Sequence, residues 1–490
     1  MLIDASRCVC EDANLLVYPK DFVLSTPANV SLSYSAANLD VGTSRNFCNF
    51  TAGLSFDQLP PHVRHECKRG LLDWLGCALA GSSTDTIARL NVALNAAGSL
   101  PKAHVVGHAQ KMGVLEAALM NGQMGHVLDF DDTHMDGVVL HTSSPVLSAL
   151  FSAATLVPCS GQDLMLAYVL GFEAGVRIGK ASPGHHDGGW HLTGTLGTLA
   201  AAIASARLLG LNASQTTYCL GIAATQSAGL QQNRGTMSKS FHAGKAAQNG
   251  LLAALLAREG FDSSTEIIEG RKGFSVTFAD RHEAAPMTSN LGQSWEILSN
   301  GYKPYACGVV LHPLIDGVMA LRAKVVDVAQ IASISLQVNP IAVRITGIEK
   351  PQTGLQSKFS LYHSAAVAWL DGVASLSQYT DAKAKDPQVV TLRDKVKVQA
   401  VETFGRDEAH VSVTLYDGTY FEAHIAHASG THQNPMTDEA IEAKFMANAQ
   451  PVIGLERCQN MLQKVASLED CLDVNELMAL CSLSNPNPNP

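Results

Sequence analysis

Seven acidic and imidazole side chains lie within one short stretch, residues 125–145 (GHVLDFDDTHMDGVVLHTSSP): Asp129, Asp131, Asp132, Asp136, His126, His134 and His141. Apolar segments with helical spacing precede and follow this stretch, and only 16% of the chain is charged. Aspartate and histidine are the side chains that move protons and hold metal ions. The stretch is therefore a candidate catalytic or metal site. The alternative is an acidic loop between helices whose aspartates cap helix ends.

Four later segments also hold polar groups within apolar or glycine-rich sequence. They contain His185 to His191, Asn233 to Lys245, Tyr302 to His312, and Lys358 to His363. In the second, Lys239, His242 and Lys245 follow one another at intervals of three and would share one side of a helix start. Free N–H groups at a helix start favour an anion, so this pattern predicts binding of a small substrate with several carboxylates. The alternative is a basic turn at the surface.

Metal and nucleotide cofactors are disfavoured by the motifs. DDTHMD (residues 131–136) resembles the aspartate-rich magnesium motif of helical terpene and prenyl-diphosphate enzymes, but their second metal motif is absent from the sequence. An EF-hand loop beginning at Asp129 would need glutamate where Leu140 stands. The sequence contains no HExxH, Walker loop, GxSxG, or GxGxxG following a strand pattern. We therefore expect no metal and no organic cofactor.

The remaining set of histidine, aspartate and lysine suits proton transfer at a carbon next to a carboxylate, with loss of water or CO₂. Lysine and histidine would neutralise the substrate charge and stabilise an enolate-like intermediate. A proton donor or acceptor should titrate near neutrality, which fits His141 and His191.

Composition narrows the possible partners and compartment. The net charge of −10 and the lack of a basic stripe argue against nucleic acid. Apolar runs are interrupted before about 18 residues, so no membrane span is expected. The first residues have early acids and no basic segment before an apolar one, unlike a signal peptide. Eleven cysteines, an odd number without CxxC, indicate a reduced, cytoplasmic protein.

The periodicity predicts a helical region followed by a strand-bearing one. Small and apolar residues recur at helical spacing, and no strand is expected between Phe47 and Phe261; the predicted helices cover residues 63–79, 114–128, 146–157, 162–180, 195–209, 217–228 and 244–258. Beyond residue 300 the pattern alternates in period two, and Asp417-Gly418 between two such runs predicts a hairpin. The predicted strands are 333–338, 342–345, 395–398, 411–415 and 420–425, with helices at 312–323 and 359–373.

These elements predict a mostly α fold, with an all-helical domain built from both chain ends and a smaller inserted α+β lid. The expected parts are an irregular extension (1–46), the first helical part (47–299), the lid (300–432), the second helical part (433–480) and a disordered tail (481–490).

Five ordered motifs resemble the MmgE/PrpD family: LDFDDTH with LHTSSPV, GWHLTGTLG, GTMSKSFHAGKAAQNGLLAALLA, and KPYACGVVLHPLID. The resemblance covers residues 47–480 and implies a homodimer without metal or organic cofactor. It also implies roles for individual residues. His141 would be the leading proton donor, with Asp129 and Thr133 orienting it and the substrate.

By the same resemblance, Lys239, Lys303 and His191 would hold carboxylates, and His363 would lie at a lid position of the substrate pocket. His242, which shares the helix start with Lys239, is the other candidate for substrate binding. Some decarboxylases of the family have a tyrosine where His363 aligns, and here Tyr362 is its neighbour.

FEAGVRIGKA (172–181) and YACGVVLH (305–312) look more like the fungal decarboxylases of the family than like its dehydratases. The resemblance therefore implies a cis-aconitate decarboxylase-like lyase that releases CO₂ and gives an itaconate-type product. The alternatives are a 2-methylcitrate dehydratase-like hydro-lyase, an epimerase of the same family, or a non-catalytic relative.

Overall fold

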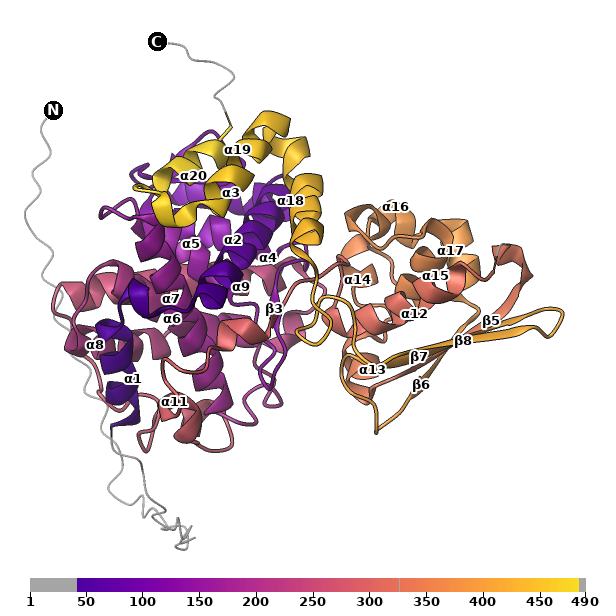
Figure 1. Cartoon of the computed structure of the whole chain (residues 1–490), viewed down its shortest axis with the longest axis horizontal. Helices are drawn as coiled ribbons and strands as arrows, with labels where there is room; N and C mark the ends of the chain where they lie inside the picture. Colours follow the sequence, from indigo (N-terminus) through magenta and orange to yellow (C-terminus); the bar gives the residue numbers. More distant parts are fainter. Residues whose placement is uncertain (1–41, 326, 484–490) are drawn as a thin grey trace, which may run out of the picture. The chain divides into compact units, whose positions relative to one another are not determined.

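The computed structural model describes residues 42–325 and 327–483. Most of the predicted extension at 1–46 and of the tail at 481–490 lies outside these residues. Within them the chain is mostly helical, which confirms the predicted fold class (Figure 1). None of the helices in the described ranges is both long and apolar enough to cross a membrane.

The helical region is formed by segments from both ends of the chain. Its helices are α1 (Thr43–Gly53), α2 (Pro61–Gly81), α3 (Asp85–Ala97), α4 (Val114–His126), α5 (Ser143–Ala153), α6 (Gly161–Lys180), α7 (Leu192–Leu208), α8 (Ala213–Ala224), α9 (Met237–Arg258), α10 (Phe274–Phe278), α11 (Ala285–Thr288), α18 (Asp438–Ile453), α19 (Leu455–Ala466) and α20 (Asn475–Cys481). In Figure 1 the C-terminal helices, in yellow, lie beside α2, in indigo. Lys444 of α18 fixes this contact, because its Nζ lies 2.6 Å from the buried carboxylate of Asp73 in α2.

Helices α4 and α9 approach so closely that glycine is required where they cross. A Cβ atom added to Gly122 of α4 would lie 2.7 Å from the Cα of Gly244 in α9. A Cβ atom on Gly244 would collide with the carbonyl oxygen of Leu119. The crossing fixes the end of α4, which carries His126, relative to the start of α9, which carries Lys239.

The strand-bearing region spans residues 312–425 and contains a four-stranded sheet. Its elements are α12 (His312–Arg322), β5 (Ile331–Val338), α13 (Pro340–Thr346), α14 (Gly354–Ser357), α15 (Leu361–Asp371), α16 (Asp381–Ala384), α17 (Pro387–Arg393), β6 (Val396–Ala400), β7 (Ala409–Leu415) and β8 (Tyr420–Ile425). The strand order is β6-β5-β7-β8, with β5 and β6 parallel and the other pairs antiparallel. The antiparallel pairing of β7 and β8 confirms the predicted hairpin.

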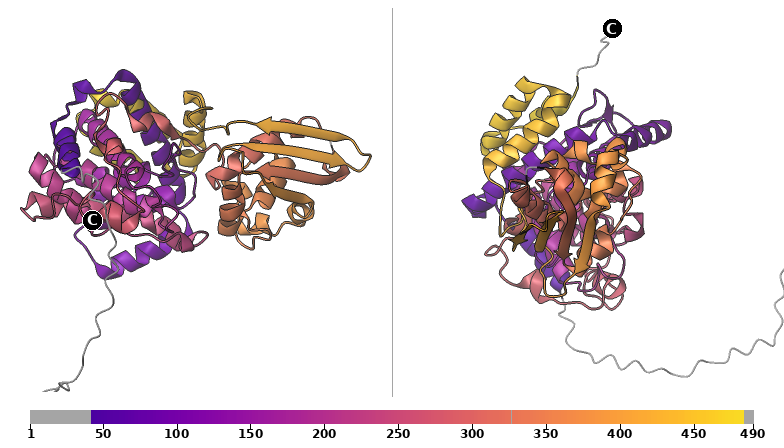
Figure 2. Two further views of the ribbon diagram at one scale, coloured as in Figure 1. Left: turned by 90° about the horizontal axis from the view of Figure 1, so that it is seen from below. Right: turned by 90° about the vertical axis from the view of Figure 1, so that its right-hand side faces the viewer.

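Helices lie against one face of the four-stranded sheet (Figure 2, left), and residues of β7 are alternately buried and partly exposed. Val411 and Val413 of β7 are fully buried, and their neighbours are partly exposed. Helix α12 lies close to this face, because a Cβ atom on Gly317 would meet the Val411 side chain at 2.5 Å. The period-two pattern of the sequence therefore corresponds to one packed face.

Three predictions of secondary structure were wrong. Residues 342–345 form part of helix α13, not a strand, because Asn339 caps its first turn with a 2.9 Å bond to the Ile341 amide and Pro340 occupies the first helical position. Helix α1 begins at Thr43, inside the expected extension. Short strands also occur in the helical region: β1 (Ala103–His104) pairs with β2 (Lys111–Met112), and β3 (Thr133–His134) pairs with β4 (Asn300–Gly301). The expected domain limits remain predictions.

Candidate active site

Strand β3 lies within the predicted site stretch, residues 125–145. Its pairing with β4 brings residues near 300 next to this stretch. Thr133 pairs with Gly301, and Lys303 follows two residues later. Lys303 is 2% exposed, and its Nζ donates to both the carbonyl oxygen and Oδ1 of Asp129, at 2.9 and 2.8 Å. A two-residue ladder thus joins positions far apart in the chain.

Asp129 has an unusual backbone conformation, and its carboxylate contacts two lysines. Its φ is 52°, in the left-handed region that non-glycine residues seldom adopt. Lys239 contributes a second ammonium, 3.1 Å from Oδ1, and Oδ2 has no partner among the described residues. Burial opposes ionisation of Asp129, but Lys239 and Lys303 outweigh it and hold its pKa well below the ordinary value. Strain of this kind is typical of functional sites.

His141 is oriented through one ring nitrogen. Its Nδ1 lies 2.8 Å from the carbonyl oxygen of Asp132 and 3.1 Å from Oγ1 of Thr133. Because a carbonyl oxygen only accepts, Nδ1 carries the proton and Nε2 is the free nitrogen. Burial holds the pKa of His141 well below its ordinary value, and the nearby Lys303 acts in the same direction. The imidazole is therefore neutral in the unliganded protein.

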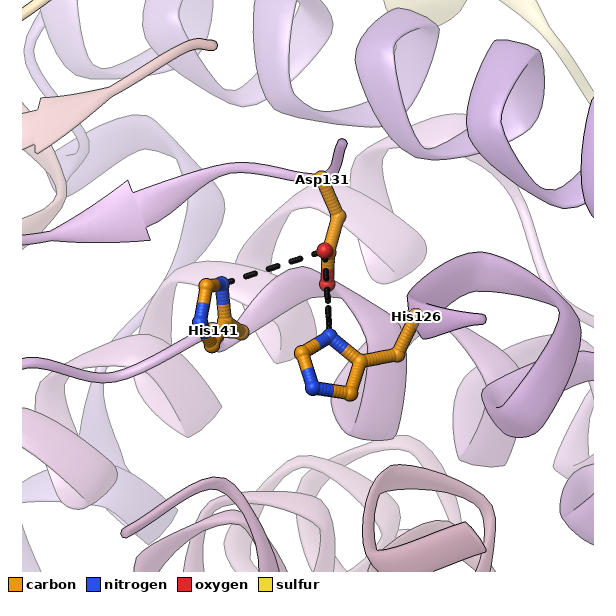
Figure 3. Close-up of side chains that lie close together, drawn as sticks. All are labelled: His126, Asp131 and His141. Atoms are coloured by element: carbon orange, nitrogen blue, oxygen red, sulfur yellow. Dashed lines mark hydrogen bonds and ion pairs between the residues drawn. The ribbon is translucent and has the colours of Figure 1, made fainter. Parts of the chain in front are cut away.

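Asp131 lies between two histidines (Figure 3). Nδ1 of His126 donates to its Oδ2 at 2.9 Å, and Nδ1 of His141 lies 3.8 Å from its Oδ1. Ser144 adds a 3.0 Å hydrogen bond to Oδ2. Nε2 of His126 is buried without a partner among the described residues, so a polar acceptor remains directed into the protein interior.

Two further histidines, His191 and His242, lie near His126. His191, which precedes α7, lies with its ring centre 5.6 Å from that of His126. Its Nδ1 is 2.9 Å from Nδ1 of His242 on α9, so one of the two rings donates and the other accepts. Burial lowers the pKa of both, in the case of His242 to about 4.

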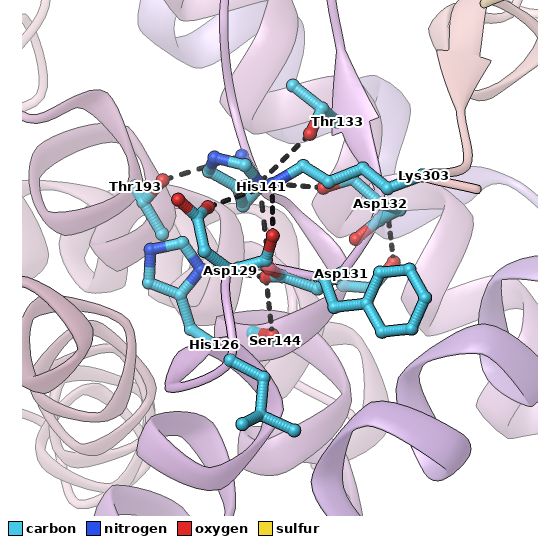
Figure 4. Close-up of polar contacts among 12 residues, drawn as sticks. His126, Asp129, Asp131, Asp132, Thr133, His141, Ser144, Thr193 and Lys303 are labelled. Carbon is cyan, nitrogen blue, oxygen red and sulfur yellow. Dashed lines mark hydrogen bonds and ion pairs between the residues drawn. The ribbon is translucent and has the colours of Figure 1, made fainter. Parts of the chain in front are cut away.

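The pKa of Asp132 is raised whereas that of Asp129 is lowered, although only two residues lie between them. Its Oδ2 accepts hydrogen bonds from Ser143 at 2.6 Å and from Asn300 at 2.9 Å, and no cation among the described residues pairs with it. Figure 4 shows Asp132 in the same cluster as Asp129 and His141. Burial and the neighbouring charge of Asp131 raise its pKa to about 8. Asp132 is therefore a protonated acid at neutral pH.

Lys358, the C-cap residue of α14 in the strand-bearing region, closes the site from the other side. Its Nζ donates to the carbonyl oxygens of Leu128 and Ala306 at 2.7 and 2.6 Å. Burial lowers its pKa to about 8. The cavity here has a volume of about 20 Å³ and is lined in part by His126, Asp129, Lys239, Lys358 and Phe359. That volume is enough for roughly one water molecule.

Two groups of side chains have donor atoms close enough to hold a cation. His126, Asp131 and His141 form one, and His134, Asp136 and Glu296 form the other, with the donor atoms of each group within 4.8 Å of one another. In the first group the carboxylate already accepts the proton of His126. The expectation of no metal remains a prediction.

Of the eight site residues predicted from the sequence, seven lie in this cluster: His141, Asp129, Thr133, His191, Lys239, Lys303 and His242. The structure puts His363 elsewhere, inside the core of the strand-bearing region, where Nε2 bonds to the carbonyl oxygen of Gln378 at 2.8 Å.

The sequence-based choice of site residues omitted His126, Asp131 and Lys358. His126 and Asp131 belong to the stretch of residues 125–145, which is rich in aspartate and histidine. Lys358 begins one of the four polar segments. Their residue types were the only signal in the sequence that could have indicated a role in the site. The contacts that place them there are made in the tertiary structure.

Comparison with known proteins identifies the family. The MmgE/PrpD N-terminal domain matches residues 45–287, and the MmgE/PrpD C-terminal domain matches residues 305–470. Cis-aconitate decarboxylase of Aspergillus terreus is 28% identical, covering 92% of this chain and 98% of that protein. A cis-aconitate decarboxylase-like protein, oryM, of Aspergillus oryzae is 30% identical, covering 89% and 96%.

Human cis-aconitate decarboxylase is 27% identical, covering 91% of this chain and 95% of the human protein. The matches thus extend over both the helical and the strand-bearing regions. The chain belongs to the MmgE/PrpD family.

Proposed function

We propose that the protein is a cofactor-independent carboxy-lyase that acts on an aconitate-type tricarboxylate and gives an itaconate-type product. Relatives named cis-aconitate decarboxylase align with about nine-tenths of the chain. The observation that carries the proposal is the meeting of His141, Lys239 and Lys303 around Asp129 in one buried site. Such a set supplies both anion recognition and a proton carrier.

The carboxylates of the substrate would be held by Lys239, Lys303 and His191. Lys303 keeps its charge, because Asp129 and Asp131 raise its pKa despite burial. Burial lowers the pKa of Lys239 although Asp129 opposes this effect, so an incoming carboxylate would strengthen its protonation. Both ammonium groups already contact Asp129 and are therefore pre-positioned.

In the proposed reaction the bond between carbon and the departing carboxylate breaks and its electron pair forms a new double bond. The original double bond shifts, and its far carbon takes a proton from Nε2 of His141. The products are CO₂ and the isomerised dicarboxylate, and the lost proton returns to His141 from solvent. Lys239 and Lys303 would stabilise negative charge that develops next to the retained carboxylates.

His141 must acquire its proton when substrate binds. It is neutral in the unliganded site, where burial and Lys303 hold its pKa down. A substrate with three carboxylates brings negative charge that favours the imidazolium and raises this pKa. Binding is therefore coupled to proton uptake, which restricts the acid form to the loaded site.

The cavity of about 20 Å³ beside Asp129 is too small for a tricarboxylate. Lys358 and Phe359 of the strand-bearing region form part of its wall. We therefore infer that this wall moves away from Asp129 and Lys239 to admit substrate. Closure afterwards would exclude water from the carbanion-like intermediate.

The test is incubation of purified protein with cis-aconitate and separately with 2-methylcitrate. Evolution of CO₂ from cis-aconitate supports the proposal, and a new alkene absorbance from 2-methylcitrate without CO₂ supports a hydro-lyase. Turnover of neither acid would remove the proposal. A parallel assay with chelator tests the metal-free expectation, since loss of activity would indicate a required cation. The candidate ligands among the described residues are the His126, Asp131 and His141 group and the His134, Asp136 and Glu296 group.

A 2-methylcitrate dehydratase-like activity is the second candidate, and the neutral state of His141 favours it. A neutral imidazole accepts a proton from carbon without prior protonation. Asp132, protonated up to about pH 8, is a buried acid three residues from Asp129. In this reading His141 removes the proton while an acid assists departure of hydroxide.

We also propose a cytoplasmic homodimer. The dimer rests on the family resemblance alone, and light scattering of the purified protein tests it. All nine cysteines within the described residues are free thiols, which suits a reducing compartment.

A further inference from the structure

A second, larger cavity lies between the helical and strand-bearing regions. Its volume is about 680 Å³. His186, Asp187 and Arg234 contribute from the helical region; Arg344 and Arg406 contribute from the strand-bearing region. The volume is more than thirty times that of the small cavity beside Asp129, and it admits a tricarboxylate with its hydration water.

The cavity wall carries one net positive charge. Three guanidinium groups, Arg234, Arg344 and Arg406, face two carboxylates, Asp187 and Glu402. Only Arg344 has a carboxylate within ion-pair distance, at 3.9 Å from Asp187, and both side chains are mostly exposed. Among the described residues no carboxylate pairs with Arg234 or Arg406. Two guanidinium groups are thus available to an anion, and arginine binds carboxylates in a two-point geometry.

Arg234 joins this cavity to the buried site. Its Nη2 donates to Nε2 of His186 at 3.3 Å, which requires a neutral His186. The next three residues, Gly235, Thr236 and Met237, line the small cavity beside Asp129, and Lys239 follows on the same helix start. The charge of Asp129 also acts on Arg234. The positive wall of the outer cavity therefore continues toward the carboxylate-binding lysines.

We propose that this cavity is an outer anion site, where Arg234, Arg344 and Arg406 capture the polycarboxylate before it enters the buried cluster. The inference rests on the proposed function for the class of substrate. A positive cleft raises the local concentration of an anion and speeds its association, and salt weakens this effect. Capture at the outer site would also keep substrate at the wall that has to move.

The test compares Arg344→Gln/Arg406→Gln with Arg89→Gln/Arg281→Gln. Both double variants remove two exposed guanidinium groups and change the net charge equally, but the second pair lies outside the cavity. The cavity variant should lower kcat/KM roughly tenfold at low ionic strength, with a much smaller change in kcat and a flatter salt dependence. The control variant should follow the wild type within about twofold.

Binding of tricarballylate, a saturated tricarboxylate, is measured by calorimetry on the same proteins. We expect the cavity variant to bind at least about fivefold more weakly than the control variant. Equal affinities together with equal salt dependence of kcat/KM would overturn the outer site. If the wild type turns over no acid, the proposed function fails, and the tricarballylate measurement still decides for or against the cavity.

Discussion

Two buried histidines, His141 in the helical region and His363 in the strand-bearing region, have nearly the same local description. Each has one ring nitrogen 2.8 Å from a backbone carbonyl oxygen, that of Asp132 for His141 and that of Gln378 for His363. Burial lowers the pKa of both. Neither hydrogen bonding nor pKa therefore separates a catalytic histidine from a structural one.

Their neighbours separate them. Around His141, Asp131 lies at 3.8 Å and the ring of His126 has its centre 4.6 Å away, and the charges of Lys239 and Lys303 reach it. The His363 ring instead packs beside Tyr379, at 5.6 Å between ring centres, within an apolar cluster. Arg393, Lys383 and Asp371 also act electrostatically on His363. Among the described residues, however, a carboxylate lies within ion-pair distance of His141 and none lies within that distance of His363. A proton carrier needs charged partners at close range, and His141 has them.

The largest expected effect is that of His141→Ala. We expect kcat to fall at least about 100-fold, the scale for loss of a general acid or base. The melting temperature should change little, because the hydrogen-bond contacts of the ring with the described residues are confined to Nδ1, beside the Asp132 carbonyl oxygen and Thr133 Oγ1. Steady-state kinetics and a thermal scan measure the two quantities. Activity close to wild type in a folded variant would remove His141 from the mechanism.

A change away from the histidines should disturb the site through the helix crossing. In Gly244→Ala the new methyl group would press on α4 at Leu119. We expect kcat/KM to fall about tenfold and stability to fall by about 1–3 kcal/mol, the usual scale for overpacking. His126 and Lys239 would then no longer hold their relative positions. Gly235→Ala is no suitable control because its φ is 77°, whereas Gly53→Ala, which has open space, is.

The sequence allowed much of this arrangement to be predicted. Periodicity located the main helices, and the spacing of Lys239 and His242 predicted a shared side at a helix start, which α9 has from Met237 onward. The prediction of a strand at residues 342–345 was wrong, because a short run with β-branched residues is compatible with both a strand and a helix. Asn339 as N-cap and Pro340 at the first helical position favour the helix. The hydrophobic pattern of the sequence therefore predicts a helix or strand correctly when the periodic run is long.

Tertiary contacts could not be read from periodicity. Lys303 and Asp129 are 174 positions apart, and the two-residue ladder of β3 with β4 that joins them has no sequence signal of its own. His363 was chosen by family alignment, which matched a position without its surroundings. The residue types in the site were visible in the sequence, and their partners were not.

A smaller effect concerns the pH dependence of stability. Asp132 stays protonated in the folded protein up to about pH 8, while in the unfolded chain it releases its proton near pH 4. The unfolded state therefore binds fewer protons than the folded state across this window, and the contribution of Asp132 to stability falls as pH rises through it. Above about pH 8 the contribution is constant.

Asp132→Asn removes this titration and keeps an oxygen that accepts from Ser143 and Asn300. We expect the melting temperature of the variant, relative to wild type, to rise by several degrees between pH 5 and pH 8. Asp136→Asn, a mostly exposed carboxylate in the same loop, serves as the control and should give a nearly constant difference. A flat difference for Asp132→Asn would indicate an ionised carboxylate.

The smallest effect on catalysis is expected for His363→Gln, which makes the comparison of the two histidines a direct experiment. Glutamine can still donate to the Gln378 carbonyl oxygen but cannot replace the ring packed against Tyr379. We therefore expect the melting temperature to fall while kcat and KM stay within about threefold of wild type, because no contact joins His363 to Asp129 or the lysines among the described residues. Kinetics at saturating and limiting substrate separate the two constants. A large rise in KM at unchanged stability would instead return His363 to the substrate pocket, and would require the strand-bearing region to turn this side of its core toward the site when substrate binds.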